Sequence, residues 1–377
     1  MTRMVYADGP SSARVGPDAV LAAAGMSGGP TDVALGWTLE RHTWLDDPAL
    51  NGVTYLGGYG LADAIAAGRI TPLPVRLSAV PSILESNPPE LGVVAVVRRG
   101  DGFAFSGSVG WGDVLARVAD RVVVEVDAHG ADLGGPAVRG NIVAELPRPV
   151  DDRTVTTRHA DDIDLTIGAL VASLVPDDAS LQFGPGGVGE GIARALDRPV
   201  RIRSGLCTDA IASLHPRGLL AAPVVAAYTQ GGVPIRRLAA AGMLELTSTT
   251  VTHDLTRLSS IPRFVGCNTA LQVGLDGAVN VERVDDRMIA AIGGHSDFCA
   301  GASRSVGGVS IIAVRSTTRH GASTIVPKVD VVSTQRSDID VVITEHGIAD
   351  LRGIGDRQRT ERLIAIAHPD HQAGLLG

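Results

Sequence analysis

Residues 178–189 read DASLQFGPGGVG, an apolar strand candidate that runs directly into a glycine-rich turn. The segment Gly191–Leu196, which follows the turn, has the composition of a helix. Glycine at such a junction permits a positive φ and lets a ligand approach the backbone closely. The N-terminus of the following helix offers unpaired N–H groups to an anion. The stretch therefore predicts an α/β architecture with a turn that can hold a phosphate-bearing ligand.

Strand candidates and helix candidates alternate along most of the remaining chain. Apolar runs rich in β-branched residues, typical of parallel strands covered on both faces, occur at Val93–Val97, Val122–Val126, Val309–Val314 and Val341–Ile343. Helix candidates lie at Ala62–Ala67, Gly112–Ala119 and Asp161–Leu174. The last of these begins with acidic residues, which suits a helix N-terminus.

The chain has 377 residues, more than a single hydrophobic core usually serves, so we expect two domains. The segment Leu146–Ala160 is polar, charged and proline-containing, which makes it the best linker candidate. We therefore predict an N-terminal α/β domain of residues 1–150 and a C-terminal α/β domain of residues 151–377. Aromatic residues make up only 3% and glycine is abundant, which favours small aliphatic α/β layers over a β-sandwich.

Charge and hydropathy argue against several classes of partner. The formal net charge is −8 and no basic block is present, so nucleic acid is not expected as a partner. No apolar run approaches the ~18–20 residues of a membrane helix, so no membrane is expected. Three cysteines without C-x-x-C spacing, and no signal peptide at Met1–Met4, predict reduced thiols in a cytoplasmic protein. Histidines are scattered, and no metal site is predicted.

One carboxylate follows the next strand candidate, Val200–Arg203. It is Asp209, the last residue of the segment GLCTD. Gly184, Gly186 and Gly189 spell G-x-G-x-x-G, and Asp209 lies twenty residues beyond Gly189, the spacing of the ribose-binding acid in dinucleotide folds. An NAD- or FAD-dependent oxidoreductase is therefore one hypothesis. The turn lies in mid-chain, however, and a purely structural turn is the other interpretation.

Four further segments, taken in order along the chain, carry a resemblance. They are LQFGPG at Leu181–Gly186, GGHSDF at Gly293–Phe298, TEHGIADLRG at Thr344–Gly353 and IAHPD at Ile366–Asp370. In this order and with these gaps they resemble the acetyl-CoA hydrolase / CoA-transferase family, which includes the 4-hydroxybutyrate and butyryl-CoA:acetate CoA-transferases. The likeness runs from about Gly57 to the end of the chain.

The resemblance implies two CoA-transferase-like, NagB/RpiA-like open α/β domains with the active site in the cleft between them. Family members move coenzyme A between short acyl groups and carboxylates through a glutamate in a G-I-H-S-E segment, which matches Gly205–Asp209 here. The resemblance thus assigns Asp209 as catalytic. It places Gly186, Gly187, Val188, Gly189, Gly293 and Gly294 against coenzyme A. Coenzyme A is then a substrate rather than a resident cofactor, and a homodimer or higher homo-oligomer is expected.

The chain departs from the family at the decisive position, because Asp209 stands in place of glutamate. Aspartate has one methylene fewer, so its carboxylate retreats by roughly 1.5 Å. Attack needs reacting atoms about 3–3.5 Å apart. The shorter acid leaves room for a water that it activates as a general base, which gives hydrolysis instead of transfer. A catalytically inactive CoA-binding relative is a third hypothesis.

Other departures concern neighbouring side chains. Cys207 replaces the family's histidine, and we expect it to be a small buried residue. Ala322 replaces a lysine associated with CoA binding, and Arg315, Arg319 and His320 are candidates to substitute for it. A lost cation weakens the grip on a phosphate. Glu345 and its neighbouring histidine follow a strand candidate, where they hold the turn or line the site.

Overall fold

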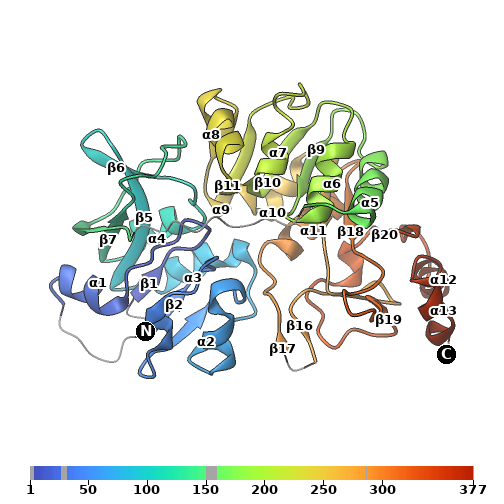
Figure 1. Cartoon of the computed structure of the whole chain (residues 1–377), viewed down its shortest axis with the longest axis horizontal. Coiled ribbons are helices and arrows are strands. Elements are labelled where there is room, and N and C mark those ends of the chain that lie inside the picture. Colours follow the sequence, from blue (N-terminus) through green and yellow to red (C-terminus); the bar gives the residue numbers. More distant parts are fainter. Residues whose placement is uncertain (1–3, 27–31, 150–158, 286, 377) are drawn as a thin grey trace. The chain divides into compact units, whose positions relative to one another are not determined.

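The computed structural model describes residues 4–26, 32–149, 159–285 and 287–376. It divides the chain into two compact units (Figure 1). The first comprises Met1–Thr154, Val225–Thr252 and Met288–Gly293, and the second comprises Val155–Val224, His253–Arg287 and Gly294–Gly377. The predicted boundary between residues 150 and 151, and much of the linker candidate, lie outside the described residues. That boundary stays a prediction, as does the location of the active site in a cleft between the domains.

The first unit is built on a parallel sheet with the strand order β4-β3-β2-β1-β5-β7-β8. Its strands are β1 (Met4–Tyr6), β2 (Asp32–Leu35), β3 (Asn51–Thr54), β4 (Ile70–Pro72), β5 (Leu91–Arg99), β7 (Arg121–Val126) and β8 (Ile142–Pro147), with β6 (Gly102–Phe105) antiparallel to β5. Further elements are α1 (Pro17–Ala23), α2 (Ala62–Ala66), α3 (Val80–Ser86), α4 (Gly112–Val118), β11 (Val224–Gln230), α8 (Val233–Ala240), β12 (Leu244–Leu246) and α9 (Thr249–Thr252).

The second unit holds the strand series β10-β9-β13-β18-β20-β21, parallel except for the last pair. The strands are β9 (Ser180–Phe183), β10 (Arg201–Thr208), β13 (Phe264–Asn268), β18 (Val309–Ala313), β20 (Val341–Thr344) and β21 (Gly347–Asp350). The helices are α5 (Asp162–Ser173), α6 (Gly187–Ala195), α7 (Asp209–Ala212), α10 (Leu255–Ser260), α11 (His295–Arg304), α12 (Asp356–Ala365) and α13 (Pro369–Leu375). Short strands β14 (Gln272–Gly274), β15 (Val279–Asn280) and β19 (Ile325–Val326) form a small separate sheet.

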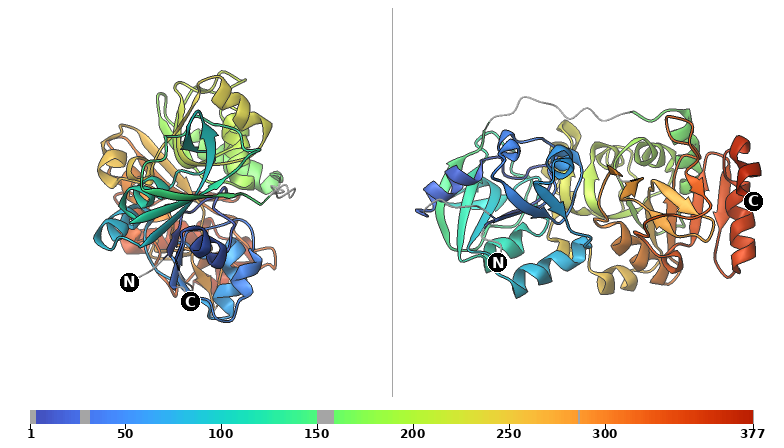
Figure 2. Two further views of the ribbon diagram at one scale, coloured as in Figure 1. Left: turned by 90° about the vertical axis from the view of Figure 1, so that its left-hand side faces the viewer. Right: turned by 90° about the horizontal axis from the view of Figure 1, so that it is seen from below.

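The alternating directions of side chains along β9 show which helix covers which face of this sheet. A Cβ on Gly189 of α6 would lie 3.4 Å from the Phe183 ring, so Phe183 faces α6. A Cβ on Gly266 of β13 would lie 3.1 Å from Ala302 of α11 and 3.6 Å from Gln182, so Gln182 faces α11. Successive strand residues point to opposite faces, so α6 and α11 cover opposite sides. Figure 2 shows the green and the orange helices on opposite sides of the strands.

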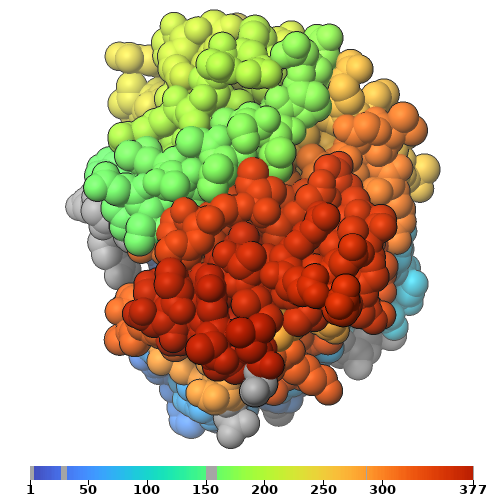
Figure 3. Space-filling model, turned by 90° about the vertical axis from the view of Figure 1, so that its right-hand side faces the viewer, coloured from blue at the N-terminus to red at the C-terminus, as the bar shows by residue number. Residues whose placement is uncertain are grey.

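The two predicted α/β units are confirmed, and the β-branched runs form β5, β7, β18 and β20 as predicted. The helix from Asp161 forms α5, where the Asp161 side chain and that of Asp164 make a reciprocal capping box. The C-terminal helices α12 and α13 lie in the red surface in Figure 3. No helix of the described ranges is long and apolar enough to span a bilayer.

Three predicted boundaries were wrong. The strand before the glycine turn begins at Ser180, because Asp178 has a left-handed φ of 58° and forms a turn. The next helix begins at Gly187 and not at Gly191, because Gly186 already occupies the cap position with a φ of 105°. The strand predicted at Val200–Arg203 runs on to Thr208.

Candidate functional site

The strand order of the second unit marks the carboxyl ends of its strands as the place for a ligand. The chain enters the sheet at β9, moves to β10 on one side, and then builds β13, β18 and β20 on the other side. In open α/β sheets, ligands bind outside the carboxyl ends of the strands where the order reverses in this way. The turn at Gly184 follows the carboxyl end of β9, so the structure places it at this switch point.

The glycine turn is open. A Cβ on Gly184 or on Gly186 would meet no atom of the described residues within 4 Å, so packing among them gives no reason for glycine at either position. Gly186 has a φ of 105°, which glycine adopts readily. Gly187 and Gly189 are buried inside the first turn of α6, and Val188 is half-buried.

Gly189 has a packing reason instead. A Cβ on Gly189 would lie 2.2 Å from the Gly184 carbonyl oxygen. Further along α6, a Cβ on Gly191 would lie 2.4 Å from the Asp164 carbonyl oxygen of α5, and one on Gly168 of α5 would lie 2.2 Å from the Gly191 carbonyl carbon. The third glycine of the G-x-G-x-x-G pattern is thus explained by close packing, and the first two are not.

Asp209 is the first residue of α7, directly after β10, and its side chain is half-buried. The helix cap is Thr208, whose hydroxyl accepts from the Ile211 N–H at 3.4 Å, and Asp209 is an acidic residue in the first turn, which suits a helix N-terminus. Cys207 is fully buried, and burial, with a smaller contribution from Asp209, raises the pKa of its thiol to about 12. The thiol stays protonated at neutral pH, which excludes it as an activated nucleophile and confirms the small buried residue that we predicted.

The strand register separates Asp209 from the glycine turn. Ile202 pairs with Leu181, and the Ser204 hydroxyl donates to the Phe183 carbonyl at 3.4 Å, so Ser204 lies level with the end of β9. Asp209 lies five residues further on, roughly 16 Å along the strand direction. A dinucleotide fold needs its acid within side-chain reach of the ribose next to the turn, so this distance argues against the oxidoreductase hypothesis.

The second glycine motif leads into α11. Gly293 has a φ of 56°, and its carbonyl accepts from the Leu77 N–H at 3.0 Å. Gly294 is the N-cap residue of α11 and is half-buried. Asp297, in the first turn of the helix, is 1% exposed. The backbone at Gly294 therefore marks a helix N-terminus on the face of the sheet opposite α6.

Glu345 holds a turn. Its carboxylate accepts from the Ser316 N–H at 2.9 Å and from the Ser316 hydroxyl at 2.7 Å. Burial raises the pKa of Glu345, but these hydrogen bonds outweigh it and leave the pKa below its ordinary value. Both carboxylate oxygens are thus occupied within the fold, which supports the turn-holding interpretation.

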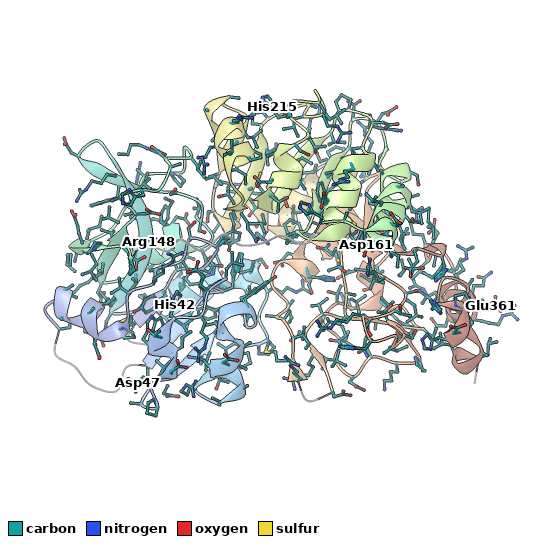
Figure 4. All side chains as sticks on the ribbon, viewed as in Figure 1. His42, Asp47, Arg148, Asp161, His215 and Glu361 are labelled. Atoms are coloured by element: carbon teal, nitrogen blue, oxygen red, sulfur yellow. The ribbon has the colours of Figure 1, made fainter. Side chains whose placement is uncertain are left out.

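The candidates for the missing lysine differ in availability. Arg315 forms ion pairs with Asp164, at 3.2 Å, and with Asp161 at the start of α5, which Figure 4 labels. Its guanidinium is therefore committed to the capping box. Arg319 is exposed, and its Nε donates to the His320 ring at 3.0 Å. Of the three candidates, the exposed pair at residues 319 and 320 is the one that a phosphate can reach without breaking a cap.

Comparison with known proteins identifies relatives of this chain. The profile of the acetyl-CoA hydrolase/transferase C-terminal domain matches residues 236–377. Butyryl-CoA:acetate CoA-transferase of Anaerostipes caccae is 28% identical over 338 residues, which are 80% of this chain and 75% of that protein. The chain is a relative of the acetyl-CoA hydrolases and CoA-transferases. Curated acetyl-CoA hydrolases are among its similar proteins as well.

Solved structures extend the likeness of this CoA-transferase relative to its whole length. The 4-hydroxybutyrate CoA-transferase of Porphyromonas gingivalis has a TM-score of 0.74 and 26% identity, covering 100% of this chain and 92% of that chain. RipA from Yersinia pestis has a TM-score of 0.86 and 23% identity, covering 100% and 93%, and shows the shared fold. The predicted family resemblance and the predicted α/β fold are therefore confirmed.

Sequence reasoning missed one residue that the structure brings to this region. His253 is 1% exposed, its ring centroid lies 4.8 Å from that of Phe298, and burial lowers its pKa to about 3. It lies against Gly205 of β10 and Gly294 at the start of α11, where an added Cβ would come within 3.1 and 2.4 Å of its Nε2. No motif marks it, because a lone histidine before the cap Asp254 of α10 looks like any loop residue.

Proposed function

We propose that this chain is an enzyme of thioester chemistry that acts on a short-chain acyl-CoA through Asp209. The observation that carries the proposal is a half-buried carboxylate at the end of β10, in a relative of the acetyl-CoA hydrolases and CoA-transferases. Coenzyme A and the acyl group enter and leave as substrate. No resident cofactor is part of the proposal.

In the transfer reaction, an Asp209 oxygen attacks the thioester carbonyl, and the carbon–sulfur bond breaks to give a mixed anhydride and CoA thiolate. The thiolate then attacks the aspartyl carbonyl, which releases the first carboxylate and leaves an aspartyl-CoA thioester. An acceptor carboxylate reverses these two steps and departs as the new acyl-CoA. Together, these easier covalent steps replace one harder direct exchange, which is the usual gain of nucleophilic catalysis.

Hydrolysis is the second candidate, and the identity of residue 209 favours it. The shorter aspartate leaves room for a water between its carboxylate and the thioester carbon. Asp209 takes a proton from this water as the water oxygen attacks, and the thiolate leaves and takes up a proton. This reaction needs no acceptor carboxylate.

We assign the coenzyme A contacts to Gly186, Gly187, Val188 and Gly189 at the switch point, and to Gly293 and Gly294 before α11. The exposed surface of Gly186 and the helix N-terminus behind it suit a phosphate. The roughly 16 Å of strand between Ser204, which is level with the end of β9, and Asp209 suits an extended molecule whose anionic end and thioester end are far apart. A cytoplasmic location and a homodimer or higher homo-oligomer belong to the same proposal.

Thiol release tests the proposal and separates its two branches. The protein is incubated with acetyl-CoA and with butyryl-CoA, with and without acetate or butyrate, and free thiol and new acyl-CoA are followed. Thiol release without an acceptor supports hydrolysis, and acyl exchange that requires an acceptor supports transfer. Asp209→Asn should lower either rate by about 10³-fold, the scale for removal of a nucleophile or base.

The remaining hypotheses give different results in the same assay. An inactive CoA-binding relative raises its Tm with coenzyme A, turns over no acyl-CoA, and is indifferent to Asp209→Asn. An oxidoreductase raises its Tm with NAD or FAD and not with coenzyme A. Either pattern would overturn the proposal.

A further inference from the structure

Two segments of the second unit meet at one buried ring. A Cβ on Gly294, at the start of α11, would lie 2.4 Å from Nε2 and 2.5 Å from Cδ2 of His253. A Cβ on Gly205, in β10, would lie 3.1 Å from the same Nε2 and 3.2 Å from Cε1. The strand that leads to Asp209 and the start of α11 therefore both lie against the Nε2 end of the same imidazole.

The ring has little freedom to move. Its side chain is 1% exposed, and the Phe298 ring of α11 lies against it with the centroids 4.8 Å apart. The next residue, Asp254, caps α10 by accepting from the Arg257 N–H at 2.7 Å, which anchors the backbone beside His253. Because burial lowers its pKa to about 3, the imidazole is neutral at the pH of any ordinary assay.

The backbone at residue 294 does not itself require glycine. Gly294 has φ −87° and ψ 0°, values that any L-residue adopts. What excludes a side chain there is the His253 ring, because a contact of 2.4 Å is shorter than packed atoms allow. The glycine before α11 is thus explained by its approach to His253.

We infer that His253 is a positioning residue, whose ring sets the spacing between β10 and the start of α11 and so aligns the thioester with Asp209. The inference rests on the proposed function. If the acyl-CoA contacts Gly294 and Asp209 at once, the separation of these two places decides whether the carbonyl carbon comes within attack distance. A misplacement of about 1 Å costs on the order of 10²-fold in rate.

His253→Ala tests the spacing. Loss of the ring lets the start of α11 settle toward β10, so kcat should fall about 30- to 100-fold while KM changes less than about threefold. His253→Gln, which keeps much of the volume, should recover kcat to within about tenfold of wild type. Leu258→Ala is the control for stability. Leu258 packs under Gly301 of α11 in the same cluster as Phe298, so its truncation lowers stability while the imidazole of His253 stays in place.

A double variant tests the contact independently of the fall in stability. Gly294→Ala should lower kcat strongly in the wild-type background, where the methyl strikes the ring, and much less in the His253→Ala background, where the ring is absent. Such non-additivity is expected only of residues in contact. Circular dichroism and the Tm with coenzyme A bound identify any variant that fails to fold. If His253→Ala fails to fold, the kcat of His253→Gln is compared with that of the wild type instead.

The outcomes separate the two proposals. If the wild type turns over acyl-CoA but His253→Ala has the wild-type kcat, or raises only KM, the positioning role is wrong and the proposed function stands. If Leu258→Ala loses as much kcat as His253→Ala, the effect is general destabilisation and the positioning role is again wrong. If the wild type turns over no acyl-CoA while Asp209→Asn changes nothing, both proposals fail.

Discussion

Tyr228 donates its hydroxyl to the carboxylate of Asp8 at 2.7 Å inside the first unit, although 220 residues separate them in sequence. Asp8 is 2% exposed, and burial, only partly offset by hydrogen bonds, raises its pKa from 3.8 to about 7. The contact ties β11 to the loop after β1, so the segment Val225–Thr252 belongs to the first unit although residues of the second unit precede it along the chain.

The raised pKa of Asp8 predicts how the stability of the first unit depends on pH. Above pH 3.8 the unfolded chain has released the Asp8 proton, whereas the folded state keeps it. The contribution of Asp8 to the free energy of unfolding is therefore complete below about pH 4 and is lost as the pH rises through 7. The loss amounts to at most about 4 kcal/mol. Asp8→Asn, which cannot ionise, should remove this slope and raise the Tm at pH 8.

Tryptophan fluorescence measures this change in the first unit, because Trp37, Trp44 and Trp111 all belong to it. Urea melts at pH 5 and pH 8 compare the wild type, Asp8→Asn and a control, Asp47→Asn, whose carboxylate is exposed. If the free energy of unfolding of Asp8→Asn depends on pH as strongly as that of the wild type, Asp8 is not the titrating group.

The second unit should respond to pH in the opposite direction. Burial lowers the pKa of His253 to about 3 and that of His295 to about 4. Each histidine is neutral in the folded state and takes up a proton on unfolding. The contribution of the two histidines to the free energy of unfolding is therefore complete above about pH 6.5 and is lost as the pH falls toward 3. At pH 5 each costs roughly 2 kcal/mol. Hydrogen exchange of α11 at pH 7 and pH 5 should show the loss, and equal protection at both values would refute it.

The sequence predicted the core of the fold but not all of its ends. The runs at β5, β7, β18 and β20 are apolar and β-branched, so local preference and burial agree. In contrast, β10 continues through Ser204 and Gly205, which are weak strand formers, and only its neighbours in the sheet hold it extended. The start of α6 at Gly187 was missed because a helix of small residues depends on close packing against α5 rather than on propensity.

The candidate site could be predicted in part. Asp209 and the open glycines are local features, so their place after a strand was visible in the sequence. The distance between them was not, because it depends on the register of β10 against β9. The role of His253 was hidden for the same reason, since its contacts with Gly205 and Gly294 join positions about fifty and forty residues apart.

Asp209→Glu should change the balance between the two reactions. The added methylene carries the carboxylate about 1.5 Å further toward a bound thioester and displaces the water that the shorter acid admits. We expect acyl exchange with a carboxylate acceptor to rise at least about tenfold relative to thiol release without acceptor. The measurement is the ratio of the two rates at saturating acetyl-CoA, with Asp209→Asn as the inactive control. An unchanged ratio would mean that side-chain length does not decide the outcome.

Gly184→Ala tests whether the open turn at the switch point lies against a ligand. Within the part of the chain that the structure describes, a methyl at Gly184 meets no atom within 4 Å, and the φ of Gly184 lies outside the left-handed region, so the fold should keep its Tm within about 1 °C. If the anionic part of coenzyme A lies on this turn, the methyl obstructs it and KM for acyl-CoA should rise about tenfold with kcat nearly unchanged, the pattern of lost uniform binding. Gly355→Ala is the control for KM, because its methyl also meets no atom of the described residues within 4 Å and Gly355 lies outside the proposed contacts. Gly355 is the N-cap residue of α12, so a small fall in Tm is expected of this control. Equal KM values for the two variants would remove the turn from the binding site.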